Sequence, residues 1–112
     1  MYKTIVSLII LITLSLGAMA APIKGSGASS CGNWLKERRN GTYAVDLNWV
    51  LGFISAYNHY IDSSTGGNGV FGSSDIEGVA AWMDNYCSSN PLSNPYTGSV
   101  ELIEELKLRS KF

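Results

Sequence analysis

The sequence predicts a small all-α domain of three to four helices, stapled by one disulfide and preceded by a cleaved signal peptide. Three observations carry this prediction: a short apolar run near the N-terminus, two cysteines in a short exported chain, and apolar residues at helical spacing through most of the remainder. The chain has 112 residues and a formal net charge of -1. This length allows one domain with one core, which excludes a two-domain enzyme or a closed barrel.

Residues 1–20 are predicted to be a secretory signal peptide. Lys3 supplies positive charge, Ile5–Leu16 is an apolar run, and Ala18 and Ala20 form a small-x-small cleavage site. A membrane anchor is the alternative, but this run rises only about 18 Å as a helix, against the roughly 30 Å of a bilayer core. We therefore expect a periplasmic or secreted protein with no membrane attachment after cleavage.

The two cysteines, Cys31 and Cys87, are predicted to form a disulfide, as is usual in short exported chains. A reactive thiol would need a C-x-x-C motif or a neighbour that activates it, and the sequence offers neither. Two cysteines and one histidine cannot fill a tetrahedral metal site, so we predict no metal and no cofactor. The bridge would lie in a single helical domain at residues 31–112, after a flexible arm at residues 21–30 that is rich in Gly, Ser and Ala.

The first predicted helix spans Cys31–Arg39. Ser29 or Ser30 precedes it as a cap, and the turn-forming pair Asn40-Gly41 follows it. Its apolar residues recur at positions i, i+3 and i+4, so one face of this helix can pack against a core.

A second helix is predicted from Leu47 to about Ile61, with Asp46 as its cap. Apolar residues lie on two of its faces, which is typical of the buried centre of a bundle. The stretch is rich in β-branched and aromatic residues, but its length and its 3.6-residue period favour a helix over a strand. Gly52 and Ala56, four residues apart, form a small-residue notch at which we expect another helix to approach closely.

A third helix is predicted after a glycine-rich loop at residues 62–72. It begins with a capping box, in which Glu77 follows Ser74 by three residues, and it ends near Ser88. Its apolar residues follow one face of the helix. That face includes Cys87, so the second sulfur is expected on the buried side, where it can meet the first.

The fourth helix is expected to begin between Asn94-Pro95 and Ser99 and to end near Arg109. Proline suits the first turn of a helix, and the order of acidic residues followed by basic residues matches the helix dipole. The residues predicted for its core face are Val100, Ile103 and Leu106, with Leu102 beside them.

No motif in the sequence points to catalysis. Gly67–Gly72 matches G-x-G-x-x-G, but a phosphate-binding turn of that type follows a strand, and here a helix precedes it. His59 lies near Asp62 and two serines, without the rigid nucleophile turn and oxyanion site of a triad. The slightly acidic charge also disfavours nucleic-acid binding. We therefore predict no enzyme activity and no nucleic-acid partner.

Aromatic residues provide the one candidate site in the sequence. Trp82 lies off the apolar face of the third helix, so we expect it either to pack under the glycine-rich loop or to face a partner. Tyr60 and Phe71 flank the same loop. Exposed Trp and Tyr residues anchor many protein interfaces. Trp82, Tyr60 and Phe71 are therefore predicted to bind a partner protein.

The order of these features resembles two groups of small exported bacterial proteins. The residues that carry the resemblance are an early cysteine, a small pair in an apolar helix, a second cysteine at a helix end, an Asn-Pro pair and a final amphipathic helix: Cys31, Gly52 with Ala56, Cys87, Asn90-Pro91 and Val100–Leu106. The pattern is similar to that of the Tai-type immunity proteins of type VI secretion, which neutralise a toxin in the periplasm. It is also similar to that of the HdeA-type acid-stress chaperones, which are disulfide-stapled helical domains.

The resemblance implies a protein-binding module of the periplasm with an immunity- or inhibitor-like role, whose partner is a toxin or another enzyme. The alternative is an acid-stress chaperone, which would expose apolar surface to unfolded clients when its carboxylates protonate. Residues 21–112 carry only 16 charged side chains, which gives an acid switch little to work with and favours the first function. The immunity group usually has a further cysteine pair that this chain lacks, and the chaperones are richer in charge and poorer in aromatics. A homodimer is a further option.

Overall fold

A computed structural model describes residues 22–62 and 69–110, so the predicted signal peptide at residues 1–20 lies outside the described residues. The regular elements of the described part are all helices, which confirms the predicted all-α class. They are the 3-10 helix η1 (Ser26–Ala28) and the α-helices α2 (Cys31–Asn40), α3 (Ala44–Tyr60), α4 (Ile76–Ser89) and α5 (Pro95–Arg109). Across the same two ranges, no helix has the length and hydropathy that a membrane span requires.

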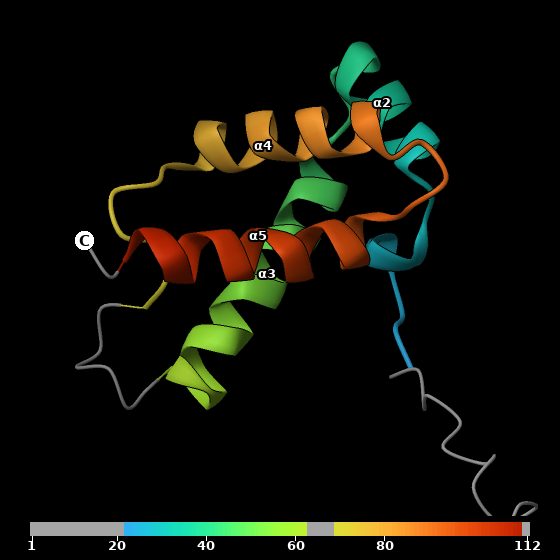
Figure 1. Ribbon diagram of the computed structural model, residues 1–112. Coiled ribbons are helices and arrows are strands. Elements are labelled where there is room, and N and C mark those ends of the chain that lie inside the picture. Colours follow the sequence, from blue (N-terminus) through green and yellow to red (C-terminus); the bar gives the residue numbers. More distant parts are fainter. Residues whose placement is uncertain (1–21, 63–68, 111–112) are drawn as a thin grey trace, which may run out of the picture.

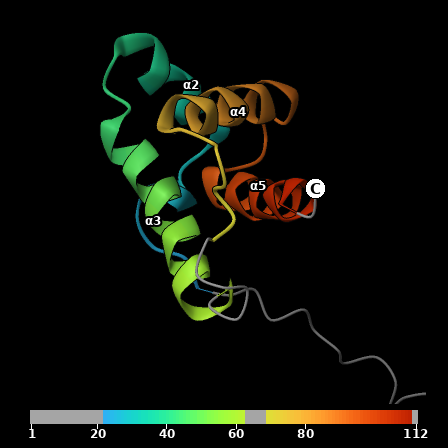
Figure 2. The same ribbon diagram turned by 90° about the vertical axis from the view of Figure 1, so that its left-hand side faces the viewer.

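The four α-helices of the described residues pack around one shared core. α4 and α5 lie side by side, and α3 crosses behind them (Figure 1). In the view turned by 90°, α3 runs along one side of this pair (Figure 2). α2 packs on α4, and α3 packs on α5. The core receives side chains from each α-helix, among them Trp34, Leu47, Val50, Ile54, Val79, Met83, Leu102, Ile103 and Leu106.

Capping residues set both ends of α2, as the sequence predicts, and the start of α5, which falls within the range expected. The Ser30 hydroxyl accepts a hydrogen bond from the Asn33 N–H at 3.0 Å at the start of α2. The Asn94 side chain accepts one from the Thr97 N–H at 2.8 Å at the start of α5. Gly41 ends α2 with a φ of 72°, a left-handed conformation that glycine adopts without strain.

Two predicted caps are wrong. Asp75, rather than Ser74, caps α4, because its carboxylate accepts a hydrogen bond from the Gly78 N–H at 2.7 Å. Aspartate and serine cap about equally well, and the aspartate directly precedes the first helical residue. α3 begins at Ala44, a strong helix former, so Asp46 lies buried in the first turn of α3 and does not cap it.

The notch predicted at Gly52 and Ala56 does not receive another helix. Both residues are exposed, and a Cβ placed on Gly52 would meet no atom within 4 Å in the described part of the chain. The reason is that the core lies on the other side of α3. α3 buries Leu47, Val50 and Ile54, which lie on one face, and the two small residues lie on the opposite face of the same helix.

The segment predicted to be a flexible arm, residues 21–30, is packed against the domain over its described part. η1 contacts both α3 and α5. The Trp49 Nε1–H donates a hydrogen bond to the Lys24 carbonyl at 3.0 Å. Gly27 is buried against the same indole, because a Cβ there would lie 2.2 to 2.4 Å from three of its ring carbons. The glycine that suggested flexibility therefore serves close approach of the backbone to a ring.

This contact makes Gly27→Ala destabilising. The new methyl group can be accommodated only if the Trp49 indole moves, and such overpacking typically lowers the free energy of unfolding by about 1–3 kcal/mol. The matched control is Gly52→Ala, whose methyl group enters open space in a helix interior and should raise that free energy by about 0.5–1 kcal/mol. Urea unfolding followed by circular dichroism measures both. Midpoints that move in the same direction would contradict the packing of η1 under Trp49.

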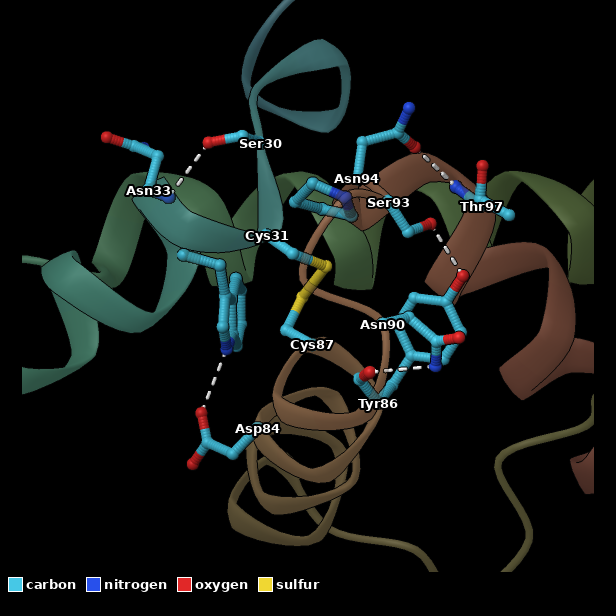
Figure 3. Close-up of a disulfide and its surroundings, with 12 residues drawn as sticks. Ser30, Cys31, Asn33, Asp84, Tyr86, Cys87, Asn90, Ser93, Asn94 and Thr97 are labelled. Carbon is cyan, nitrogen blue, oxygen red and sulfur yellow. Dashed lines mark hydrogen bonds between the residues drawn. A yellow bond between two sulfur atoms is a disulfide. The ribbon is translucent and has the colours of Figure 1, made fainter.

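The predicted disulfide is present between Cys31 and Cys87. The two Cα atoms lie 4.9 Å apart, and both side chains are fully buried. Figure 3 shows the bridge between the first turn of α2 and the end of α4. It joins residues 56 positions apart and so ties the first α-helix to the second half of the domain. A structural disulfide indicates an oxidising environment outside the cytoplasm.

A polar network around Asp84 holds the same two helices next to the bridge. Figure 3 shows Asp84 beside the bridge with one of its hydrogen bonds. The carboxylate accepts hydrogen bonds from Trp34 Nε1 at 2.8 Å and from Arg38 Nε and Nη2 at 2.9 and 2.8 Å. Arg38 also lies over the Tyr43 ring, 4.4 Å from its centroid. The hydrogen bond with Asp84 raises the pKa of Arg38 above its ordinary value, so this guanidinium stays charged. α2 is thus fixed on α4 by a disulfide and by a salt bridge.

Candidate functional site

The three residues predicted to bind a partner do not form one patch. Trp82 lines a hollow between α4 and α5, and Phe71 lines a smaller hollow that shares part of its wall with the first. Tyr60 lines a separate groove between α3 and α5. Different faces of α5 form the walls of the groove and of the hollows, so α5 separates them. The structure therefore offers two candidate surfaces where the sequence predicted one.

The first surface, the α3–α5 groove, has a volume of about 350 Å³ and an almost wholly apolar lining. It is defined by Phe53, Ala56, Tyr57, Tyr60, Ile61, Val100, Ile103 and Glu104. Tyr60 is 76% exposed and Ile61 is 64% exposed, both at the C-terminal end of α3. His59 packs edge-on against Tyr60, with 4.7 Å between the ring centroids. Large apolar side chains are therefore exposed to solvent at one end of this groove.

The second surface, the α4–α5 hollow, has a volume of about 320 Å³ and a mixed lining. It is defined by Ser73, Ser74, Asp75, Gly78, Val79, Trp82, Leu102, Glu105, Leu106 and Arg109. The Trp82 Nε1–H donates a hydrogen bond to the Glu105 carboxylate, which joins α4 to α5. Tyr86 stacks on Trp82, with 5.5 Å between the ring centroids and 6° between the planes. The indole thus binds α5 through its Nε1–H and also lines the hollow.

Glu105 is the charged centre of the α4–α5 hollow. A hydrogen bond from Arg109, and second to it one from Trp82, lower the pKa of Glu105 below its ordinary value of 4.5. Because the folded-state pKa is the lower one, the charged carboxylate stabilises the fold above about pH 4.5, and this contribution is lost as the pH falls through the folded-state pKa. The side chain is 38% exposed, so solvent screens these bonds and the contribution is small.

Glu105→Gln is therefore expected to reduce the acid sensitivity of the fold. At pH 7 the wild type should be more stable than this variant by about 1 kcal/mol or less, and the difference should shrink as the pH falls below the ordinary glutamate pKa. Urea midpoints measured between pH 7 and pH 3 test this. Glu104→Gln is the control, because Glu104 pairs with the exposed Lys107 and contacts no indole. A pH profile of Glu105→Gln that parallels the wild type would contradict the role of this carboxylate.

The described end of the glycine-rich loop is fixed to α3 by Asn58, a contact that sequence reasoning missed. The Val70 N–H donates a hydrogen bond to Asn58 Oδ1 at 2.9 Å, and the Val70 side chain is buried. Gly69 has a φ of 62°, and a Cβ there would lie 2.7 Å from the Asn58 amide. Gly67, the first residue of the G-x-G-x-x-G match, lies outside the described residues. No local sequence pattern signals this contact, because it joins α3 before the loop to the chain after it, twelve residues later.

No group of three His, Cys, Asp or Glu side chains converges on a common point that could hold a metal ion anywhere in residues 22–62 and 69–110. In comparisons with protein-family models, with curated proteins and with solved structures, the chain matches none of them. The resemblance to the Tai-type and HdeA-type groups therefore stays a prediction.

Proposed function

We propose that this chain is a protein-binding module without catalytic activity of its own, exported to the periplasm or secreted, with an immunity- or inhibitor-like role. The α3–α5 groove is its binding site. The observation that carries the proposal is the exposure of Tyr60 and Ile61 beside a groove lined almost only by apolar side chains. Single exposed apolar residues are ordinary, but a contiguous apolar patch around a hollow is typical of docking sites.

The groove fits an amphipathic segment of a partner protein that carries basic side chains. Glu104 lines the groove, and Glu101 is exposed one turn earlier on α5. Apolar side chains of the segment would fill the groove, and a Lys or Arg beside them would pair with Glu104. The exposed pair of Glu104 with Lys107 is weak enough to exchange for such a contact. A second copy of this chain would bring the same acidic rim, so a partner of opposite charge fits better than a homodimer.

The groove is supported by a scaffold that keeps its walls in place. Phe53 of α3 packs edge-on against Tyr96 of α5, with 5.6 Å between the ring centroids, and stacks on Trp49 at 5.3 Å. The contact between Phe53 and Tyr96 holds α3 against α5, about two turns of α3 before the exposed end of the groove. A preformed site loses less conformational entropy on binding than a flexible one, which suits an inhibitor-like role.

The test places a photo-crosslinking amino acid at Tyr60 and, as the control, at Leu92, a fully exposed apolar residue on the α4–α5 connection. We expect a discrete crosslinked partner from position 60 and none from position 92. With that partner purified, Tyr60→Ser should weaken binding by about 30-fold, as an aromatic anchor does, and Leu92→Ser should leave it unchanged.

Two results would overturn this proposal. One is equal binding of the purified partner by Tyr60→Ser and Leu92→Ser. The other is a crosslinked product that consists of two copies of this chain, together with a dimer in sedimentation that Tyr60→Ser dissociates. The second result would assign the groove to self-association.

An acid-stress chaperone is the second candidate function, and the hydrogen bond between Trp82 and Glu105 supports it. This bond joins α4 to α5, and protonation of Glu105 removes the charge that strengthens it. Loosening of the two helices would expose core side chains to client proteins. Circular dichroism and dye binding between pH 7 and pH 2 test this function. Cooperative opening near pH 3–4 with suppressed client aggregation would support it, and a chain that binds no dye down to pH 2 would exclude it.

A further inference from the structure

We propose that the α4–α5 hollow binds the guanidinium group of an arginine side chain on another protein, with the Trp82 indole as its platform. This site is separate from the α3–α5 groove and does not depend on it. Three features of the hollow carry the inference: a fixed aromatic ring with one face covered by protein, an excess of carboxylates over basic groups, and a size that suits one side chain.

The ring of Trp82 is held in one orientation. Its Nε1–H is bound to Glu105, and Tyr86, four residues later on α4, covers one face in a parallel stack. On the other side, four residues earlier, is Gly78, which has no side chain and lines the same hollow. Of the two residues one turn to either side of Trp82 along α4, only Tyr86 therefore places a side chain against the indole. A fixed indole face of this kind attracts cations, and the planar guanidinium stacks on it best.

The charges around the ring favour the same ligand. Asp75 and Glu105 bring two carboxylates to the hollow, and Arg109 brings one guanidinium, which is bound to Glu105 at 2.5 Å. An anionic ligand would face both carboxylates and find the basic group already paired. A carboxylate has lone pairs for several donors, and a guanidinium has five N–H groups in a planar fork, so the incoming group can share either carboxylate. The hydroxyls of Ser73 and Ser74 add acceptors at the rim.

The hollow is large enough to take one arginine side chain. Its volume of about 320 Å³ lies at the lower end of the range for small-molecule sites, which is roughly 300–1,000 Å³. The apolar wall formed by Val79, Leu102 and Leu106 can cover the aliphatic part of an arginine while the guanidinium lies over the indole. The hollow therefore suits an arginine that projects from a partner surface.

The probe for this site is N-acetyl-arginine amide, titrated into the oxidised domain while the tryptophan indole N–H resonances are recorded by NMR. We expect the Trp82 resonance to shift and saturate at millimolar probe, and those of Trp34 and Trp49 to stay in place. The isosteric, uncharged N-acetyl-citrulline amide should bind at least about 10-fold more weakly, and added salt should weaken the arginine probe.

Two variants remove charge from the hollow without removing its ring. Asp75→Asn keeps a good helix cap, and Glu105→Gln keeps an acceptor for the indole. Each should weaken the arginine probe by about 5–10-fold, whereas the control Glu77→Gln, on an exposed residue outside the hollow, should not. Tyr60→Ser should also leave the probe binding unchanged, which separates this site from the groove. A Trp82 resonance that does not move, or that moves equally with the citrulline probe, would overturn the proposal.

Discussion

Replacing Cys31 and Cys87 together by alanine is expected to lower the free energy of unfolding by about 4 kcal/mol. The bridge joins residues 56 positions apart, and a crosslink over such a loop removes conformational entropy from the unfolded chain by about that amount. Small domains have only about 5–15 kcal/mol in total, so the fold should become marginal. At about 4–8 °C per kcal/mol, the thermal midpoint should fall by about 15–30 °C.

Thermal and urea unfolding, followed by far-UV circular dichroism with and without reductant, measure this effect. Reduced wild type should approach the unfolding midpoint of Cys31→Ala/Cys87→Ala, and reductant should not change the double variant itself, which is the internal control. Alanine is preferred to serine because both side chains are fully buried, and a buried hydroxyl would add its own cost. An oxidised midpoint that reduction leaves unchanged would show that the bridge contributes nothing to stability.

Trp34→Ala is expected to have a similarly large effect. Trp34 is the largest fully buried side chain of the described part, and truncation of a buried tryptophan typically costs about 3–5 kcal/mol. The loss would also remove one of the donors that bind Asp84 between α2 and α4. Urea unfolding at neutral pH measures the change in the free energy of unfolding.

Trp34→Phe separates the contribution of the buried ring from that of its hydrogen bond to Asp84. Phenylalanine keeps most of the apolar contact but cannot donate to Asp84, so it should cost about 1–2 kcal/mol, clearly less than the alanine variant. Asp84→Asn, with an acceptor kept for the indole and the charge removed, is the complementary variant. Equal losses for Trp34→Phe and Trp34→Ala would contradict the assignment of the stability to burial of the ring.

Local sequence predicts those parts of the fold that depend on neighbours along the chain. Both ends of α2 and the start of α5 follow from Ser30, Gly41 and Asn94, and the pairing of the cysteines follows from their number and their helical faces. The environment of Gly27 does not follow from the sequence, because glycine-rich composition is the same for a flexible arm and for a backbone pressed against a ring. Likewise, helical spacing separates Gly52 from the core residues of α3 but does not say which face another helix covers.

The candidate site was predicted only in part for the same reason. Helical spacing singled out Trp82, but its acceptor Glu105 lies in another helix, and the groove around Tyr60 depends on how α3 packs on α5. The Asp84 network could have been found. Trp34 lies three residues after the first cysteine and Asp84 three residues before the second, so a bridge between the two helices brings donor and acceptor together. Arg38, one turn farther along α2, reaches the same carboxylate with its longer side chain.

The Asp84 network also bears on how the covalent link can form. A chain that still has both thiols can seat its first α-helix through Trp34 and Arg38, because these contacts do not require the sulfur–sulfur bond. Non-covalent docking would then hold the two thiols at a high effective concentration relative to each other, which favours their oxidation outside the cytoplasm. We therefore expect Asp84 to promote formation of the disulfide as well as to stabilise the folded domain.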